Sequence, residues 1–186
     1  MERSIAERRR EWLVRAAFEA GLIVVGLVGA LALNDWHEER QRNERVRDAL
    51  TSIRIEMQGN VESINHVIAF NENLMTTLTE SARTGVPYMN TMVPGMNLST
   101  TAWDAARDAG ISSDIPFATL MVLGRAYTAQ TSFQREIEFF ANQLYTGGVT
   151  EDLRKRPLYF RGIVSDYALH ARRLRDHYVA ALKVSP

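Results

Sequence analysis

The stretch WLVRAAFEAGLIVVGLVGALALNDW, residues 12–36, determines the fold of this chain. Before its last three residues its only charges are Arg15 and Glu19. At a helical rise of about 1.5 Å per residue, its 25 residues span roughly 37 Å, and the hydrocarbon core of a bilayer is about 30 Å thick. Trp12 and Trp36 suit the two membrane interfaces, where amphipathic indole rings are enriched. The sequence therefore predicts one transmembrane helix.

The composition limits what the rest of the chain can be. With 186 residues, of which 46% are hydrophobic, the chain can bury one domain-sized core besides a membrane helix. The formal net charge of +0 argues against general nucleic-acid binding. The chain contains no cysteine, so disulfides, thiolate metal sites and thiol nucleophiles are excluded. No nucleic-acid partner is expected.

Residues 1–11 predict a short cytoplasmic tail. Lys and Arg near the span number 5 at its N-terminal end, with Arg15 inside the span counted, and 4 on the other side, which is a slight excess. The stronger consideration is that a short basic leader before an apolar run directs the export of the residues C-terminal to that run. We therefore expect a single-pass protein of the bacterial inner membrane, with residues 37–186 in the periplasm.

A cleavable signal peptide is the competing interpretation of the N-terminal region. Ala30-Leu31-Ala32 satisfies the A-x-A cleavage pattern, and Arg9-Arg10 resembles part of a twin-arginine leader. Against cleavage, the helical pattern continues past Ala32 without a helix-breaking residue, and Glu19 interrupts the apolar region. We therefore favour a retained membrane anchor.

The chain after the span carries helical periodicity. Apolar residues recur in steps of three and four from Val46 to Leu78, which predicts an amphipathic helix from Asp35 to about Thr84. The pattern leaves open whether this helix is continuous with the span. Gly85-Val86-Pro87 ends it.

Three more helices come after it in the predicted chain. A short one covers 98–109, with Ser99 or Thr100 available as its N-cap. A long one starts after 112–114 and reaches about Tyr145, and the last starts near Glu151 or Pro157. No strand-like alternation persists, so the predicted fold is all-α: a transmembrane helix followed by an antiparallel bundle of three long helices and one short helix.

The periodicity also predicts which residues the two later long helices bury. For the first the expected buried residues are Phe117, Leu120, Gly124, Tyr127, Ile137, Phe140 and Leu144. For the last they are Phe160, Ile163 or Val164, Tyr167, Ala171, Leu174, Tyr178 and Leu182. Trp103 is expected to fix the short helix onto the bundle.

The opening of the chain resembles an uncharacterised family of small bacterial membrane proteins, in which a Glu precedes a Gly-containing span that ends in N-x-W-x-E-E-R. The matching residues are Glu19, Gly26, Asn34, Trp36, Glu38, Glu39 and Arg40. A second resemblance is to a W-(D/E)-A-A…G element, here Trp103-Asp104-Ala105-Ala106 with Gly110. Asp35 and His37 depart from the pattern, so no role carries over to them. The resemblance implies a topology and no chemistry.

Glu19 is the most informative single residue, because it lies about 7 Å from the midpoint of the span, inside the hydrocarbon. At 100° per residue, Glu19, Gly26 and Ala30 share one helix face. A carboxyl group among small residues predicts that this face contacts another helix. The alternative is a local pair with Arg15, whose side chain would snorkel outward. One helix is no pathway for protons or ions.

The histidines give a weak metal pattern. His170 and His177 are seven residues apart and hence roughly 10 Å apart on a helix, too far to share one metal ion. Asp166 with His170 would need a further ligand, such as His66. Ordinary surface hydrogen bonds are the expected role, so we predict no metal site and no cofactor.

Two surfaces are candidates for contacts with partners. Tyr88, Met89, Met92 and Met96 form an apolar loop that is either tucked in or a partner surface. The region from Glu151 onward is basic and would suit anionic headgroups or an acidic partner, although mixed charge runs usually form a solvated helix face.

No catalytic motif is present: there is no Gly-rich phosphate loop, no G-x-S-x-G and no converging carboxylate pair. The leading hypothesis is therefore a non-enzymatic membrane protein that acts through protein–protein contacts, either as an accessory or scaffold subunit of a membrane complex or by self-association. The alternative is a periplasmic bundle that senses a ligand and signals through a partner, since a tail of 1–11 is too short for an output domain.

Overall fold

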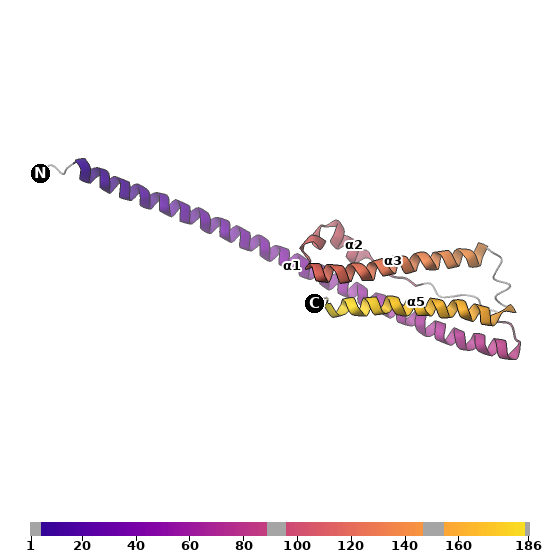
Figure 1. Ribbon diagram of the computed structural model, residues 1–186. Coiled ribbons are helices and arrows are strands. Elements are labelled where there is room, and N and C mark those ends of the chain that lie inside the picture. Colours follow the sequence, from indigo (N-terminus) through magenta and orange to yellow (C-terminus); the bar gives the residue numbers. More distant parts are fainter. Residues whose placement is uncertain (1–4, 89–95, 147–154, 185–186) are drawn as a thin grey trace. The chain divides into compact units, whose positions relative to one another are not determined.

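The computed structural model of the chain describes residues 5–88, 96–146 and 155–184. Every regular element in these ranges is helical, and none is a strand (Figure 1). The elements are α1 (Ile5–Thr84), α2 (Thr101–Asp108), the 3-10 helix η1 (Ile111–Asp114), α3 (Phe117–Thr146) and α5 (Pro157–Val184). The prediction of an all-α chain with a long apolar helix at its N-terminus is confirmed.

The chain divides into two compact units, Met1–Arg45 and Val46–Pro186, and the boundary falls inside α1. The sequence predicts the start of the helical bundle at residue 37. The stalk residues 37–45 are exposed, and the first α1 residue that packs against the core of the second unit is Val46. The helix after the span is therefore continuous with the span itself.

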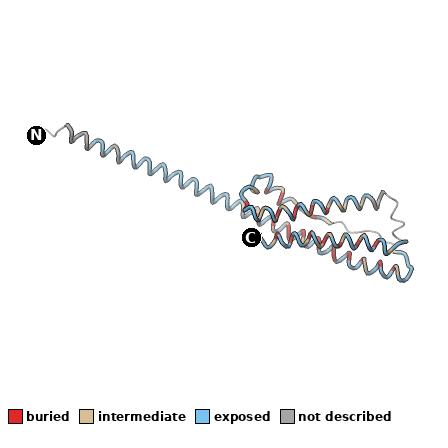
Figure 2. The backbone as a smooth tube through the Cα atoms, viewed as in Figure 1, coloured by how far each residue is buried: buried red, intermediate tan, exposed pale blue. Residues whose placement is uncertain are grey.

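In the first unit the described residues of the apolar segment are exposed. Every residue from Phe18 to Leu33 is exposed, which Figure 2 shows as unbroken pale blue. Among the described residues, α1 is the one helix that is long and apolar enough to cross a membrane, and none of its apolar window is buried. By length and composition α1 is a candidate transmembrane helix.

The second unit has its own hydrophobic core, to which α1, α2, α3 and α5 all contribute. Most of the predicted apolar positions of α1 are buried, whereas Val46 and Val61 are only partly buried. The fully buried large side chains include Ile53, Met57, Ile64, Leu78, Leu123, Phe160, Leu174 and Tyr178. A smaller cluster of Leu74, Leu78, Phe160 and Val164 lies at the end where α1 finishes and α5 starts.

The contacts between α1 and α5 run in opposite order along the two helices. Arg54 Nη1 donates to the backbone oxygen of Leu182 at 3.3 Å. Further along α1, Asn60 Nδ2 donates to the Tyr178 hydroxyl at 3.1 Å. Still further, the Arg172 guanidinium bonds Glu72 at 2.6 Å.

Helix α3 lies beside α5 in Figure 1, and three side-chain contacts join the two helices. Gln130 bonds Tyr178, and the rings of Phe133 and Tyr167 stack at 5.5 Å. Glu136 pairs with His170 at 2.9 Å.

Residue Ser99, just before α2, contacts Asn60 in the middle of the bundle part of α1 and not the Thr84 end of that helix. The amide of Ser99 donates to Asn60 Oδ1 at 2.9 Å. Tyr127 of α3 meets Glu56 at the same level of α1. As a result α3 starts at the end of the bundle where α1 enters it.

The prediction that Phe117 is buried is wrong, since its side chain is 76% exposed. The buried face of α3 is set by Leu123, Tyr127 and Gln130, and Phe117 lies well away from this face at 100° per residue. Gly124 is only partly buried. The side chains of Phe140 and Leu144 lie outside the described residues.

Candidate functional site

The face of α1 that carries Glu19 is open. Arg15 Nε lies 3.2 Å from Glu19 Oε1, four residues apart, with side-chain exposures of 81% and 63%. The local pair expected as the alternative is therefore present. Gly26 and Ala30 are exposed, and a Cβ added at Gly26 would meet nothing within 4 Å. Glu19 therefore has a local charged partner, and the small residues on the same face are uncovered in the described chain.

At the C-terminal end of the apolar segment, side chains one helical turn apart contact each other. Asn34 Nδ2 donates to Glu38 Oε1 at 2.7 Å. The Arg40 guanidinium lies 5.6 Å from the centre of the Trp36 ring, a cation–π arrangement. Trp36 is 57% exposed and Trp12 is 68% exposed, so both indoles are available to a membrane interface.

A second candidate site is a polar cluster at the start of α2, built around Glu56 of α1. Glu56 Oε2 accepts hydrogen bonds from Ser99 Oγ at 2.7 Å and from the amide of Ala102 at 2.8 Å. Glu56 Oε1 accepts from the Tyr127 hydroxyl at 2.7 Å and from the amide of Trp103 at 3.4 Å. The carboxylate of one helix therefore caps the N-terminus of another, where backbone amides otherwise lack partners.

The predicted N-cap is correct in position and wrong in mechanism. Thr100 is the N-cap residue of α2, but its side chain makes no capping bond to the backbone. Its hydroxyl donates instead to Asp104 Oδ2 at 2.7 Å. Glu56 takes over the capping role because Ser99 and the first residues of α2 lie beside it on α1.

Buried amides extend the Glu56 cluster into the core. Asn60 Nδ2 donates to the Ser99 oxygen at 2.8 Å and contacts the Tyr178 hydroxyl. The Tyr178 hydroxyl donates to Gln130 Oε1, and Gln130 Nε2 donates to the Leu98 oxygen at 3.2 Å. Asn60 and Gln130 are buried, and these contacts satisfy them.

Aromatic rings cover the Glu56 cluster. Trp103 stacks on Tyr127 with ring centres 5.0 Å apart and an interplanar angle of 7°. Tyr127 meets Tyr178 edge-on at 5.9 Å. Burial raises the pKa of both tyrosines, and for Tyr127 the hydrogen bond to the Glu56 carboxylate raises it further. Both hydroxyls therefore stay protonated as donors, which suits a structural clamp. The expected role of Trp103 is confirmed, because it is buried against the bundle.

Two buried polar side chains in another part of the core lack such partners. Asn71 is fully buried, and its amide nitrogen and oxygen have no hydrogen-bond partner among the described residues. The Tyr167 hydroxyl also has no hydrogen-bond partner among the described residues, and burial raises its pKa to about 12. Each such group costs about 1–3 kcal/mol relative to a hydrogen-bonded one.

The histidines do not gather into a metal site within the described residues. His170 Nδ1 lies 2.9 Å from Glu136 Oε1 of α3, rather than pairing with Asp166. His66 lines an open depression on the outer face of α1 together with Gln58, Val61, Glu62, Asn65 and Ala69. No group of three potential metal-ligating side chains occurs in this part of the chain.

The described part of the predicted Met-rich loop is tucked in. Tyr88 is partly buried, with its ring 6.3 Å from that of Phe160. Met96 packs against the main core. Met89 and Met92 lie outside the described residues. A partner surface that uses these methionines stays a prediction.

Comparison with protein-family models, curated proteins and solved structures finds no match to this chain. The assignment of a function therefore rests on the chain's own geometry.

Proposed function

We propose that this chain is a non-enzymatic single-pass protein of the bacterial inner membrane. In this proposal its N-terminus is cytoplasmic, and an antiparallel helical bundle lies in the periplasm. It acts through protein–protein contacts, as an accessory or scaffold subunit of a membrane complex or by self-association. The observation that carries the proposal is the exposed apolar segment of α1, together with its open Glu19 face.

The exposure of residues 18–33 is the first support for a membrane anchor. A soluble helix of this composition would bury its apolar side chains, because leaving them in water costs about 25 cal/mol per Å². None of the apolar window of α1 is buried against the described chain. A bilayer provides the apolar surroundings that the protein itself does not.

The second support, for a protein partner, is the position of Glu19. An ionisable side chain inside the hydrocarbon is costly and is usually turned toward another protein surface. Gly26 and Ala30 on the same face permit the close approach of a second helix. The pair with Arg15 lowers the cost of the charge but leaves this face uncovered.

The third support is the hydrogen bonding of the Glu56 cluster. Its carboxylate and its buried amides are all partnered within the protein. A polar group engaged in this way is unsuited to bind a substrate, and it fixes α2 on the bundle. The bundle therefore fits a rigid contact module better than a catalytic one.

Gly26→Leu tests the proposed contact. A leucine here blocks the close approach of a neighbouring helix, so we expect the complex extracted in mild detergent to lose its partner or to become monomeric. The measurement is native gel electrophoresis with mass spectrometry of the purified, tagged protein. Gly21→Leu is the matched control, because it lies on the opposite face of the same helix and an added Cβ there also meets nothing within 4 Å.

Glu19→Leu should weaken the same assembly if its carboxyl group contributes to the contact. If all three variants and the parent protein run as the same monomer, the partner hypothesis fails. Equal losses for Gly26→Leu and Gly21→Leu would show that the effect is not specific to the Glu19 face.

Ligand sensing by the bundle is a second candidate function, favoured by Asn71 and Tyr167. Their unpartnered groups in the core offer an amide and a hydroxyl to a small polar ligand. The sensing hypothesis predicts that Asn71→Leu abolishes the response to such a ligand. In the scaffold hypothesis the same change only removes an unsatisfied polar group and raises the free energy of unfolding.

A further inference from the structure

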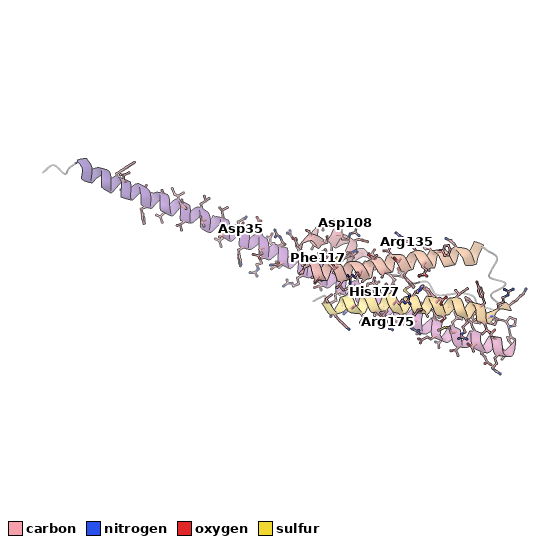
Figure 3. The ribbon with its side chains drawn as sticks, viewed as in Figure 1. Asp35, Asp108, Phe117, Arg135, Arg175 and His177 are labelled. Atoms are coloured by element: carbon pink, nitrogen blue, oxygen red, sulfur yellow. The ribbon has the colours of Figure 1, made fainter. Side chains whose placement is uncertain are left out.

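The first turn of α3 exposes an apolar surface that the core does not use. Phe117 is 76% exposed and Met121 is 42% exposed, and Pro116 beside them is also exposed. We call these three residues the Phe117 surface. Phe117 and Met121 are four residues apart, so they share one helix face. Figure 3 labels Phe117 at the start of α3.

The Phe117 surface lies at the end of the bundle where α1 enters it. Tyr127 of α3 contacts Glu56 of α1, and further along the two helices Gln130 and Asn60 both contact Tyr178, so α1 and α3 run in the same direction. Counting ten residues back from each places Phe117 at about the level of Val46. Side chains on a helix lean toward its N-terminus, so Phe117 and Met121 lean toward this end of the bundle.

The chain tethers this end of the bundle closely to the proposed anchor. Ten residues of continuous helix separate Trp36 from Val46, which is about 15 Å at the helical rise. The headgroup region extends several ångströms beyond the hydrocarbon core, since the bilayer is about 40–45 Å thick with it and about 30 Å without it. An apolar surface tethered this closely to the anchor is therefore within reach of the headgroup region.

We propose that the Phe117 surface docks on the lipid bilayer that holds the anchor. The occupant is the interface between headgroups and acyl chains, into which apolar side chains insert by about 5–10 Å. This inference rests on the proposed membrane anchor. It adds that the bundle lies on the membrane surface through α3 instead of standing free on its stalk.

The test uses single cysteines, because the natural chain has none. Three variants of the full chain each carry one cysteine labelled with an environment-sensitive fluorophore: Phe117→Cys, Leu158→Cys and Val25→Cys. Each variant is reconstituted into phosphatidylcholine nanodiscs that contain a nitroxide-labelled lipid. Leu158 is the matched control: it is 60% exposed, on α5 at the opposite end of the bundle. Val25 reports the span itself and is 70% exposed.

The expected result is strong lipid quenching at Val25, several-fold more quenching at Phe117 than at Leu158, and protection of Phe117 from aqueous iodide. Quenching at Val25 with equal quenching at Phe117 and Leu158 would overturn the docking and leave the anchor intact. Iodide protection at Phe117 without lipid quenching would also overturn it, because protein would then cover the surface. An unquenched Val25 would overturn both the anchor and the docking.

Discussion

Trp103→Ala is expected to lower the free energy of unfolding by about 3–5 kcal/mol, the range for removing a large buried aromatic side chain. Trp103 is 9% exposed and stacks on Tyr127 over the Glu56 cluster. Its loss leaves a cavity and removes the main apolar contact of the eight-residue helix α2. The measurement is urea unfolding of the full chain in mild detergent, monitored by circular dichroism.

Phe117→Ala is the control for Trp103→Ala. Both changes remove an aromatic ring, but Phe117 is 76% exposed and lies outside the core. We expect its effect in detergent to stay within about 0.5 kcal/mol, as is usual for surface positions. Equal effects of the two substitutions would contradict the assignment of Trp103 to the core and of Phe117 to the surface.

Glu56→Ala is expected to destabilise the protein by about 2–4 kcal/mol, because it removes both a helix cap and a charged acceptor. Four donors lose their partner: Ser99 Oγ, the amides of Ala102 and Trp103, and the Tyr127 hydroxyl. The hydroxyl of Tyr127 is buried, so water does not readily replace the carboxylate. Unfolding in urea and amide hydrogen exchange of α2 measure the effect, and α2 should exchange fastest.

Glu72→Ala is the matched control for Glu56→Ala. Glu72 is on the same helix and also pairs across to another helix, with Arg172 at 2.6 Å, but its side chain is 53% exposed. An exposed ion pair is worth about 0–1 kcal/mol, so the change should be small. If Glu56→Ala proved as mild as Glu72→Ala, α2 would not depend on its cap from α1.

The helices and most of the core can be predicted from patterns of single residues. The steps of three and four from Val46 to Leu78 predict the buried face of α1, and the structure confirms it at Ile53, Met57 and Ile64. These patterns are local, because each helix needs only one continuous apolar face. The prediction for Phe117 failed because this residue lies off the buried face of α3, which Leu123 and Tyr127 define.

The Glu56 cluster was not predicted, because it depends on the path of the chain between helices. Ser99 reaches Glu56 and Asn60 across 43 and 39 residues. Helical periodicity does not predict contacts between residues so far apart in the sequence. A signal was nevertheless present: Asn60 stands between Met57 and Ile64 in the apolar seam, where a buried polar residue requires a partner.

Labelling of single cysteines in intact spheroplasts with a membrane-impermeant maleimide tests whether α1 crosses the membrane and leaves the bundle outside the cytoplasm. Ser132→Cys is placed at an exposed position of α3, and Ser4→Cys in the predicted cytoplasmic tail. We expect the cysteine at 132 to react in intact spheroplasts, and the cysteine at 4 to react only after lysis. Equal reactivity of both positions before lysis would contradict a membrane-spanning α1, and the reversed pattern would contradict its orientation.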